Sequence, residues 1–260
     1  MTAGRNARLA LGGAAVARAA LAAAAALTVR PAGAPWRRMN YAKRPVTLLG
    51  GPALAASATV SAVLGAPVGA RAATAVVGAV SGLVGGYDDL AGARPEQARD
   101  KGLAGHLAAL KDGRVSAGAV KVAGIGAAAC VAAVLTRRDG RSAVDAVLTT
   151  GLVAGTANLV NLLDLRPGRA GKAGVLLAAA TLAVLPDDLG ERVMLGDCGA
   201  NALGALLGLR LASIPGRVPR AGLLAGVVAL TLASEKVSFT KVIEATPGLR
   251  ELDRLGRRPS

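Results

Sequence analysis

The sequence predicts an all-α, polytopic transmembrane helical bundle of about seven or eight spans, each close to the length a bilayer requires. Its 260 residues are 53% hydrophobic with a mean hydropathy of +0.48, which is high for a soluble domain. Apolar runs recur along the chain without the alternation of polar and apolar residues that membrane barrel strands show. Because only helices and closed barrels satisfy backbone hydrogen bonds in lipid, these runs predict helices.

The predicted spans follow from the apolar runs, since a helix needs roughly 20 residues to cross the hydrocarbon core. In chain order they are Leu9–Val29, Val46–Leu64, Ala70–Gly86, Ala117–Leu135, Ala143–Leu163, Met194–Leu209 and Ala221–Ala233. The first run also fits a cleaved signal peptide, but a retained helix is favoured because a sequence motif begins a few residues after it. Without repeats or a linker, residues 1–260 are predicted to form one integral membrane domain with a basic tail at 236–260.

The distribution of Lys and Arg predicts the orientation. One set of loops carries more than twice as many of them as the other, and comprises Arg30–Arg44, Leu90–Lys121, Arg166–Lys172 and the tail after Ser234. The positive-inside rule places this set in the cytosol. The N-terminus is then outside, the C-terminus is cytosolic and the number of crossings is odd.

A shorter apolar run, Ala173–Leu185, must not cross completely in this topology. It is predicted to be a re-entrant or broken segment, which a membrane protein tolerates only where the backbone is packed in protein or lines a wet cavity. If the run did cross, Asp197 would lie on the opposite side from Asp164.

Carboxylates stand at the ends of three predicted spans. Asp88 and Asp89 close one, Asp164 closes another and Asp197 opens a third. An ionisable group in such a place is costly and indicates a functional site by default. In the predicted topology all four face the cytosol, where converging carboxylates suit Mg²⁺. The simpler alternative is a set of helix ends that reach water.

Polar residues near these carboxylates extend the candidate site. Asn158, Asn161 and Asp164 are spaced i, i+3, i+6, which places them near one face of a helix. His106 lies in an amphipathic stretch, Asp100–Lys111, suited to the membrane surface. It either helps to bind phosphate or is structural.

Glycines flank two of the same segments, at Gly50, Gly51, Gly196, Gly199 and Gly204. They allow close backbone approach to a ligand. Helix packing by small residues is the equally plain alternative.

The formal net charge of +15 does not indicate nucleic-acid binding. The basic residues lie between apolar runs rather than along one helix face, as membrane orientation requires. The expected surroundings are a lipid membrane, with no nucleic-acid partner.

Four blocks, in order, resemble motifs of the polyprenyl-phosphate sugar-1-phosphate transferases, which include the phospho-N-acetylmuramoyl-pentapeptide transferases and the GlcNAc-1-phosphate transferases. The blocks are Lys43–Gly51 (KRPVTLLGG), Gly86–Asp89 (GYDD), Asn158–Asp164 (NLVNLLD) and Met194–Ala200 (MLGDCGA). Residues 101–121 are similar to the loop that follows the Asp pair in some members. Each block alone is a weak signal, whereas four in the right order are specific.

The resemblance implies a Mg²⁺-dependent phosphotransferase of the plasma membrane with a cytosolic active site. A polyprenyl phosphate attacks the β-phosphate of a UDP-sugar, UMP leaves, and a polyprenyl-diphospho-sugar forms for cell-envelope glycans such as peptidoglycan. The transferred group is a phospho-N-acetylhexosamine or a phospho-MurNAc-type group. The sequence allows a homodimer.

The same resemblance implies roles for individual residues. Asp197 is the expected principal Mg²⁺ ligand. Asp88 or Asp89 is expected to orient or deprotonate the lipid phosphate, or to assist the metal. Residues expected to hold the nucleotide-sugar or its phosphates are Asn158, Asn161, Asp164, Lys43, Arg44 and His106.

The chain departs from the family pattern at several places. Pro167 stands where a second Asp is frequent, Asp187 stands where an Asn is frequent, and residues 234–258 contain no histidine. The stretch between Asp164 and Asp197 is also short by about one helix. A non-catalytic relative that binds lipid-linked precursors or scaffolds envelope assembly is therefore an alternative. A small transporter with an intramembrane carboxylate pathway is a third, although no inverted repeat favours it.

Overall fold

The all-α class is confirmed by a computed structural model that describes residues 2–91, 102–137, 142–175 and 179–257. Helices account for about 78% of the chain. Five helices in the described ranges are long and apolar enough to cross a membrane, which indicates a membrane protein. These are α1 (Thr2–Thr28), α3 (Arg71–Ala91), α5 (Ala117–Leu135), α6 (Ala143–Leu163) and α10 (Arg217–Lys236).

The remaining helices are shorter. They are α2 (Gly50–Gly65), α4 (Gly102–Lys111), α7 (Arg169–Val175), α8 (Ala179–Leu189), α9 (Gly196–Ala212), α11 (Phe239–Ala245) and α12 (Leu249–Arg254), with the 3₁₀ turns η1 (Pro31–Trp36) and η2 (Val68–Ala70). At about 1.5 Å per residue, the 16 residues of α2 and the 17 of α9 fall short of a hydrocarbon core of roughly 30 Å.

Among the boundaries that differ from the predicted ones, two affect the candidate site. Helix α2 begins at Gly50 rather than Val46 because β2 (Pro45–Thr47) pairs antiparallel with β1 (Arg37–Met39). The turn between the strands is held by Asn40, whose side-chain oxygen accepts from the backbone N–H groups of Ala42 and Arg44, each at 2.9 Å. Helix α3 continues past the predicted end to Ala91, so Asp88 and Asp89 lie in its final turn.

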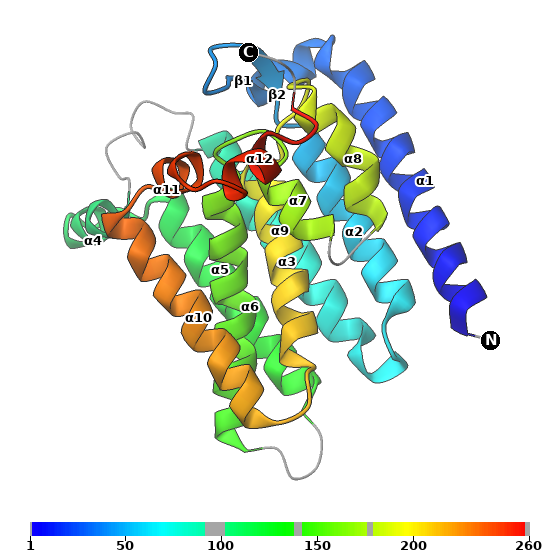
Figure 1. The fold of residues 1–260 in the computed structure, drawn as a ribbon. Helices are drawn as coiled ribbons and strands as arrows, with labels where there is room; N and C mark the ends of the chain where they lie inside the picture. The colour runs from blue at the N-terminus through cyan, green and yellow to red at the C-terminus, as the bar shows by residue number, and fades with distance from the viewer. Residues whose placement is uncertain (1, 92–101, 138–141, 176–178, 258–260) are drawn as a thin grey trace.

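The long helices run between two ends of one bundle, which Figure 1 shows. The N-terminus of α1 lies at one end, and the hairpin β1–β2, the start of α9 and the helices α11 and α12 lie at the other. Helix α9 packs against α2, α3 and α6. A methyl group on Gly204 would lie 2.6 Å from the carbonyl oxygen of Thr156, and one on Gly208 would lie 2.3 Å from that of Leu152. These glycines therefore let α9 and α6 pack backbone to backbone.

Helices α7 and α8 form a short hairpin that enters the bundle and returns to the same end (Figure 1). The backbone N–H of Gly168, just before α7, donates to Asp188 Oδ2 in the last turn of α8 at 3.0 Å. The two ends of the hairpin therefore lie side by side. This segment includes the predicted broken run at 173–185.

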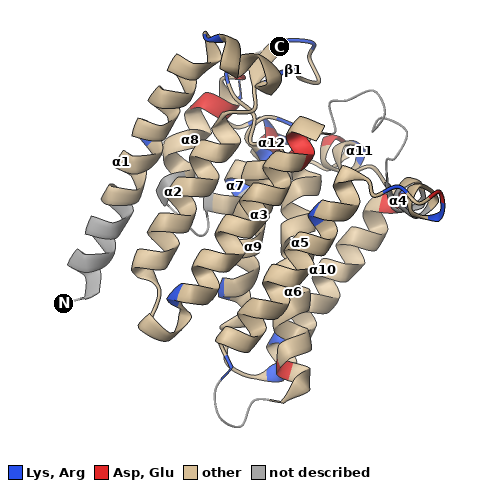
Figure 2. Ribbon diagram, turned by 180° about the vertical axis from the view of Figure 1, so that it is seen from behind, with Lys and Arg blue, Asp and Glu red and all other residues tan. Residues whose placement is uncertain are grey.

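Charged residues are sparse along the middle of the bundle and gather toward its ends (Figure 2). Large apolar side chains are instead exposed on the outer faces, among them Leu83, Val122, Val134, Val147 and Val218. Helix α10 is the most exposed of the five long apolar helices, with 11% of its most apolar window buried. An apolar exterior of this extent fits a surface that faces lipid.

Candidate functional site

The end of the bundle that carries the hairpin also holds the predicted carboxylates. Asp88 comes from the last turn of α3 and Asp197 from the first turn of α9. The side-chain ammonium of Lys121, in the first turns of α5, lies 2.6 Å from Asp88 Oδ2 and 2.6 Å from Asp197 Oδ2. The two carboxylates are thus brought together around one cationic group.

Asp89 has a different role from its neighbour. Its two carboxylate oxygens accept from the backbone N–H groups of Asp197 and Cys198, each at 2.9 Å. These N–H groups lie in the first turn of α9, where helix amides have no partner within the helix and a carboxylate is favourable. Asp89 therefore fixes the position of Asp197, while Asp88 faces Lys121.

Small residues make this close arrangement feasible. A methyl group on Gly85 would lie 2.3 Å from the backbone oxygen of Asp197, and one on Gly51 would lie 2.1 Å from that of Leu195. Gly196 has a φ of +56° and sits against the Asp89 carboxylate. Glycines in α2 and α3 thus let two helices reach the first turn of α9.

Asp164 extends the acidic group from a third helix, α6, whose last residue it follows. Its carboxylate accepts from the backbone N–H of Gly196. Burial, with the nearby charges of Asp188, Asp197 and Asp89, holds the pKa of Asp164 well above its usual value. The structure thus brings Asp164 and Asp197 to the same end of the bundle.

Asp188 adds a carboxylate that the sequence motifs did not indicate. Its side chain is buried, with 2% exposure, and accepts from Gly168. Burial raises the pKa of Asp188 to about 7. The acidic group is therefore larger than predicted.

The two predicted amides lie beside this group. Asn158 is exposed and lies about two turns before Asp164, whereas Asn161 is half-buried and lies about one turn before it. Within the described part of the chain neither side chain has a hydrogen-bond partner. Both amides are thus free to bind a ligand.

The basic residues of the hairpin divide in function. Lys43 is exposed at the turn with a φ of 57°, whereas Arg44 forms an ion pair with buried Glu191 at 3.3 Å. Glu191 also accepts from Asn40 at 2.7 Å. Arg44 and Glu191 therefore tie the hairpin to the segment before α9, whereas the Lys43 ammonium has no ion-pair partner among the described residues.

His106 falls in α4, but its side chain lies outside the described residues. No group of three or more Asp, Glu, His or Cys side chains with metal-site geometry occurs in the described ranges. The pair Asp88 and Asp197 nevertheless suits Mg²⁺, which usually takes one or two protein carboxylates and completes its shell with water and phosphate oxygens.

Lys121 is the residue that motif analysis missed most clearly. It is a lysine inside the apolar run 117–135, and an ionisable group in such a run is itself a functional signal. Its link to Asp88 and Asp197 could not be predicted, because it depends on how α3, α5 and α9 pack.

Comparison with family models, curated proteins and solved structures gives no match for this chain. The family resemblance therefore remains a prediction from the order of the four motifs.

Proposed function

We propose that this chain transfers a sugar 1-phosphate from a UDP-sugar to a polyprenyl phosphate at a membrane surface, releasing UMP. The observation that carries the proposal is the meeting of Asp88, Asp89, Asp164 and Asp197, from three helices, at one end of the bundle. Phosphoryl transfer depends on positioning and charge neutralisation more than on covalent chemistry by the protein. This end of the bundle offers groups of both kinds.

The donor set at Asp88 and Asp197 fits Mg²⁺. Their oxygens surround the ammonium of Lys121, a cation in the place that a metal ion would take. These two carboxylates would hold the ion, with Asp197 as the principal ligand. When bound, Mg²⁺ would neutralise charge on the diphosphate of the nucleotide-sugar.

The chain's own residues then have distinct roles. Asp88 is proposed to orient the lipid phosphate or to accept its proton. Asp89 is proposed to position Asp197, because the amides of α9 occupy both of its oxygens. Lys121 is proposed to turn from the carboxylates toward phosphate oxygens when substrate binds.

The nucleotide-sugar is proposed to bind on the side of α6 and the hairpin. Asn158 and Asn161 offer unpaired amides, and Lys43 offers an exposed ammonium. Asp164 is proposed to bind the nucleotide-sugar or to orient these amides, and His106 to contact phosphate from the amphipathic helix α4.

The proposed topology is a multi-pass protein of the plasma membrane with the acidic end in the cytosol. The path of the chain supports it: the five long apolar helices run between the two ends, the shorter α2 and α9 carry the chain from one end toward the other, and α7–α8 returns to the end it left (Figure 1). The N-terminus would then be outside and the C-terminal segment cytosolic. The basic loops support the same orientation.

The test is UMP release by the full-length chain in liposomes that contain a polyprenyl phosphate and Mg²⁺. Several UDP-sugars should be screened, including UDP-N-acetylglucosamine and UDP-MurNAc-pentapeptide. We expect UMP release that needs both substrates and falls by about 10²–10³-fold in Asp197→Asn, a typical loss when a charge-stabilising group is removed. The matched control is Asp187→Asn, a carboxylate at the same end that pairs with Arg18 at 3.0 Å.

Absence of UMP release with every sugar would overturn the proposal. Equal activity in Asp197→Asn and the wild type would overturn the assignment of the metal ligand.

One observation favours the alternative of a non-catalytic relative. The ammonium of Lys121 already neutralises the carboxylate pair, so the site is balanced without a metal ion. That alternative predicts UDP-sugar or lipid binding without turnover, in the wild type and in Lys121→Gln alike.

A further inference from the structure

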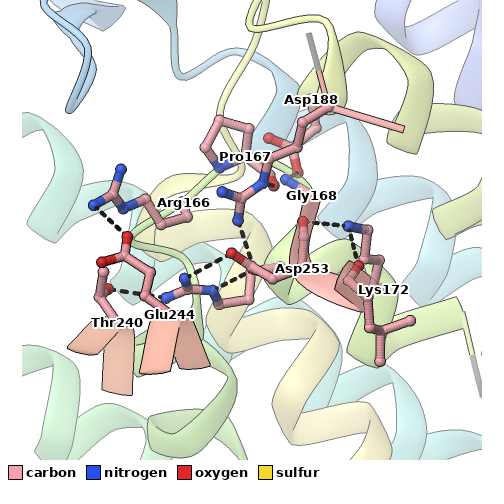
Figure 3. Close-up of polar contacts among 11 residues, drawn as sticks. Arg166, Pro167, Gly168, Lys172, Asp188, Thr240, Glu244 and Asp253 are labelled. Atoms are coloured by element: carbon pink, nitrogen blue, oxygen red, sulfur yellow. Dashed lines mark hydrogen bonds and ion pairs between the residues drawn. The ribbon is translucent and has the colours of Figure 1, made fainter. Parts of the chain in front are cut away.

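The residues after α10 fold back across the acidic end of the bundle and contact the start of α7 (Figures 1 and 3). The Arg169 guanidinium donates from Nε to Asp253 Oδ1 at 2.8 Å and from Nη2 to Oδ2 at 3.1 Å. Arg257 Nη2 donates to the same Oδ1 at 2.6 Å. One carboxylate in α12 thus holds two arginines.

Further contacts connect the same two parts of the chain. The ammonium of Lys172 donates to the backbone oxygens of Leu252 at 2.8 Å and Asp253 at 2.7 Å. Arg257 Nε donates to the backbone oxygen of Pro167 at 3.0 Å. We refer to Arg169, Lys172, Asp253 and Arg257 together as the C-terminal clasp.

The clasp is buried and specific. The side chains of Arg169 and Asp253 are 6% and 8% exposed. Burial alone would raise the pKa of Asp253, but the hydrogen bonds from Arg169 and the charges of Arg257 and Lys172 outweigh it and hold the pKa below its usual value. Removing the carboxylate would leave a buried guanidinium without its partner, which is strongly unfavourable.

The clasp is joined to the candidate site through a short loop. Residues 165–168 lead directly from Asp164 to Arg169. Within the loop, Gly168 donates to buried Asp188, and Arg166 lies 4.0 Å above the ring of Tyr41 in the turn beside Lys43. Arg166 also contacts Glu244 of α11 at 3.4 Å (Figure 3).

We propose that Asp253 is a positioning residue for the transfer reaction: through the clasp, the C-terminal segment fixes the loop after Asp164 and the nucleotide-sugar side of the site. The inference rests on the proposed function. It deepens that function by assigning a role to a part of the chain that none of the four motifs contains.

The test compares Asp253→Asn with Glu251→Gln in the full-length chain in liposomes. Glu251 is a matched control because it lies in the same helix, is exposed, and pairs with Arg250 rather than with α7. The first readout is the rate at which trypsin cleaves the exposed sites Lys241 and Arg254. The second is the separate measurement of KM and kcat for UMP release.

In Asp253→Asn we expect cleavage to accelerate on the order of 10-fold, because proteolysis follows the population of the open segment. We expect KM for the UDP-sugar to rise about 10-fold with kcat within about 3-fold, because ground-state binding is what is lost. Glu251→Gln should leave cleavage, KM and kcat unchanged. Asp253→Glu keeps the charge, so its KM for the UDP-sugar should lie between those of Asp253→Asn and the wild type.

If Asp253→Asn does not fold, Arg257→Gln removes only the outer arginine and should shift cleavage and KM in the same direction by a smaller factor. Faster cleavage with an unchanged KM would overturn the positioning role and leave a merely structural clasp. Unchanged cleavage would overturn the clasp itself. A wild type that releases no UMP overturns the proposed function, and the positioning role with it, whereas the cleavage rates still report on the clasp.

Discussion

Asp145 and the carboxylates of the candidate site lie at opposite ends of the bundle and differ in their partners. At the end far from the acidic site, Asp145 in the first turn of α6 accepts from Arg217 at 2.9 Å and from Arg220. It also completes a capping box with Ser142. At the other end, Asp88 and Asp197 share the ammonium of Lys121, whereas Asp89, Asp164 and Asp188 form no ion pair within the described ranges.

Carboxylates of the first kind stabilise the fold, whereas those of the second kind remain available for a ligand. A carboxylate surrounded by arginines and helix amides is fully satisfied and has no capacity left for a ligand. A cluster of carboxylates that outnumbers its cations is costly to maintain, and in a membrane protein such an arrangement indicates a site that binds a cation or moves a proton.

Asp88→Asn should lower UMP release by about 10²–10³-fold, because it removes one of the two carboxylates that hold the proposed metal ion. Asp145→Asn should leave the activity of the folded protein near that of the wild type. The rate of UMP release is measured per mole of folded protein in the same liposomes. Equal losses of activity in the two variants would contradict the contrast.

Asp145→Asn should instead cause the largest loss of thermal stability in this set. It leaves Arg220, whose side chain is 5% exposed, without its carboxylate partner, and removing one partner of a buried pair is strongly unfavourable. The melting temperature in detergent, followed by circular dichroism, measures the effect. A melting temperature within a degree or so of the wild type would show that the far end is not held by this pair.

Asp188→Asn should stabilise the protein at alkaline pH. Because folding raises the pKa of Asp188 from 3.8 to about 7, the wild type loses stability as the pH rises through this interval and loses no more above it. The variant should therefore gain about 1–3 kcal/mol at pH 8 and little at pH 4. Unfolding midpoints at the two pH values test this, and a gain that is equal at both would contradict it.

Mg²⁺ should stabilise the wild type by a small amount. At about ten times its dissociation constant a bound ligand contributes about 1.4 kcal/mol. The gain should persist in Asp145→Asn and vanish in Asp197→Asn, since Asp197 is a proposed ligand and Asp145 is not. A shift in melting temperature with Mg²⁺ that survives Asp197→Asn would place the ion elsewhere.

Sequence patterns predicted several features at residue level. The bounds of α5 and α6 match the predicted spans, because long apolar runs with capping serines before them leave little choice of helix start. The meeting of Asp88, Asp164 and Asp197 at one end also follows from span order, provided that the segment at 173–185 turns back. Figure 1 shows that α7–α8 does return to its own end of the bundle.

Other features could not be predicted because they depend on contacts between distant segments. The motif indicates an Asp pair, but only packing shows that Asp89 bonds to α9 while Asp88 faces Lys121. Arg44 matched a ligand-binding motif, yet its partner is Glu191. Neither assignment has a local signature, since each pair is separated by tens of residues or more in sequence.

Apolar runs and isolated charges are local properties of the chain, so the helical membrane character and the acidic motifs could be predicted from the sequence. Packing in three dimensions determines which carboxylates share a cation, which carboxylate positions a helix, and how the C-terminal segment clasps α7. These contacts depend on close packing at Gly51 and Gly85. At both positions the backbone of α9 or of the residue before it lies too close to leave room for a methyl group.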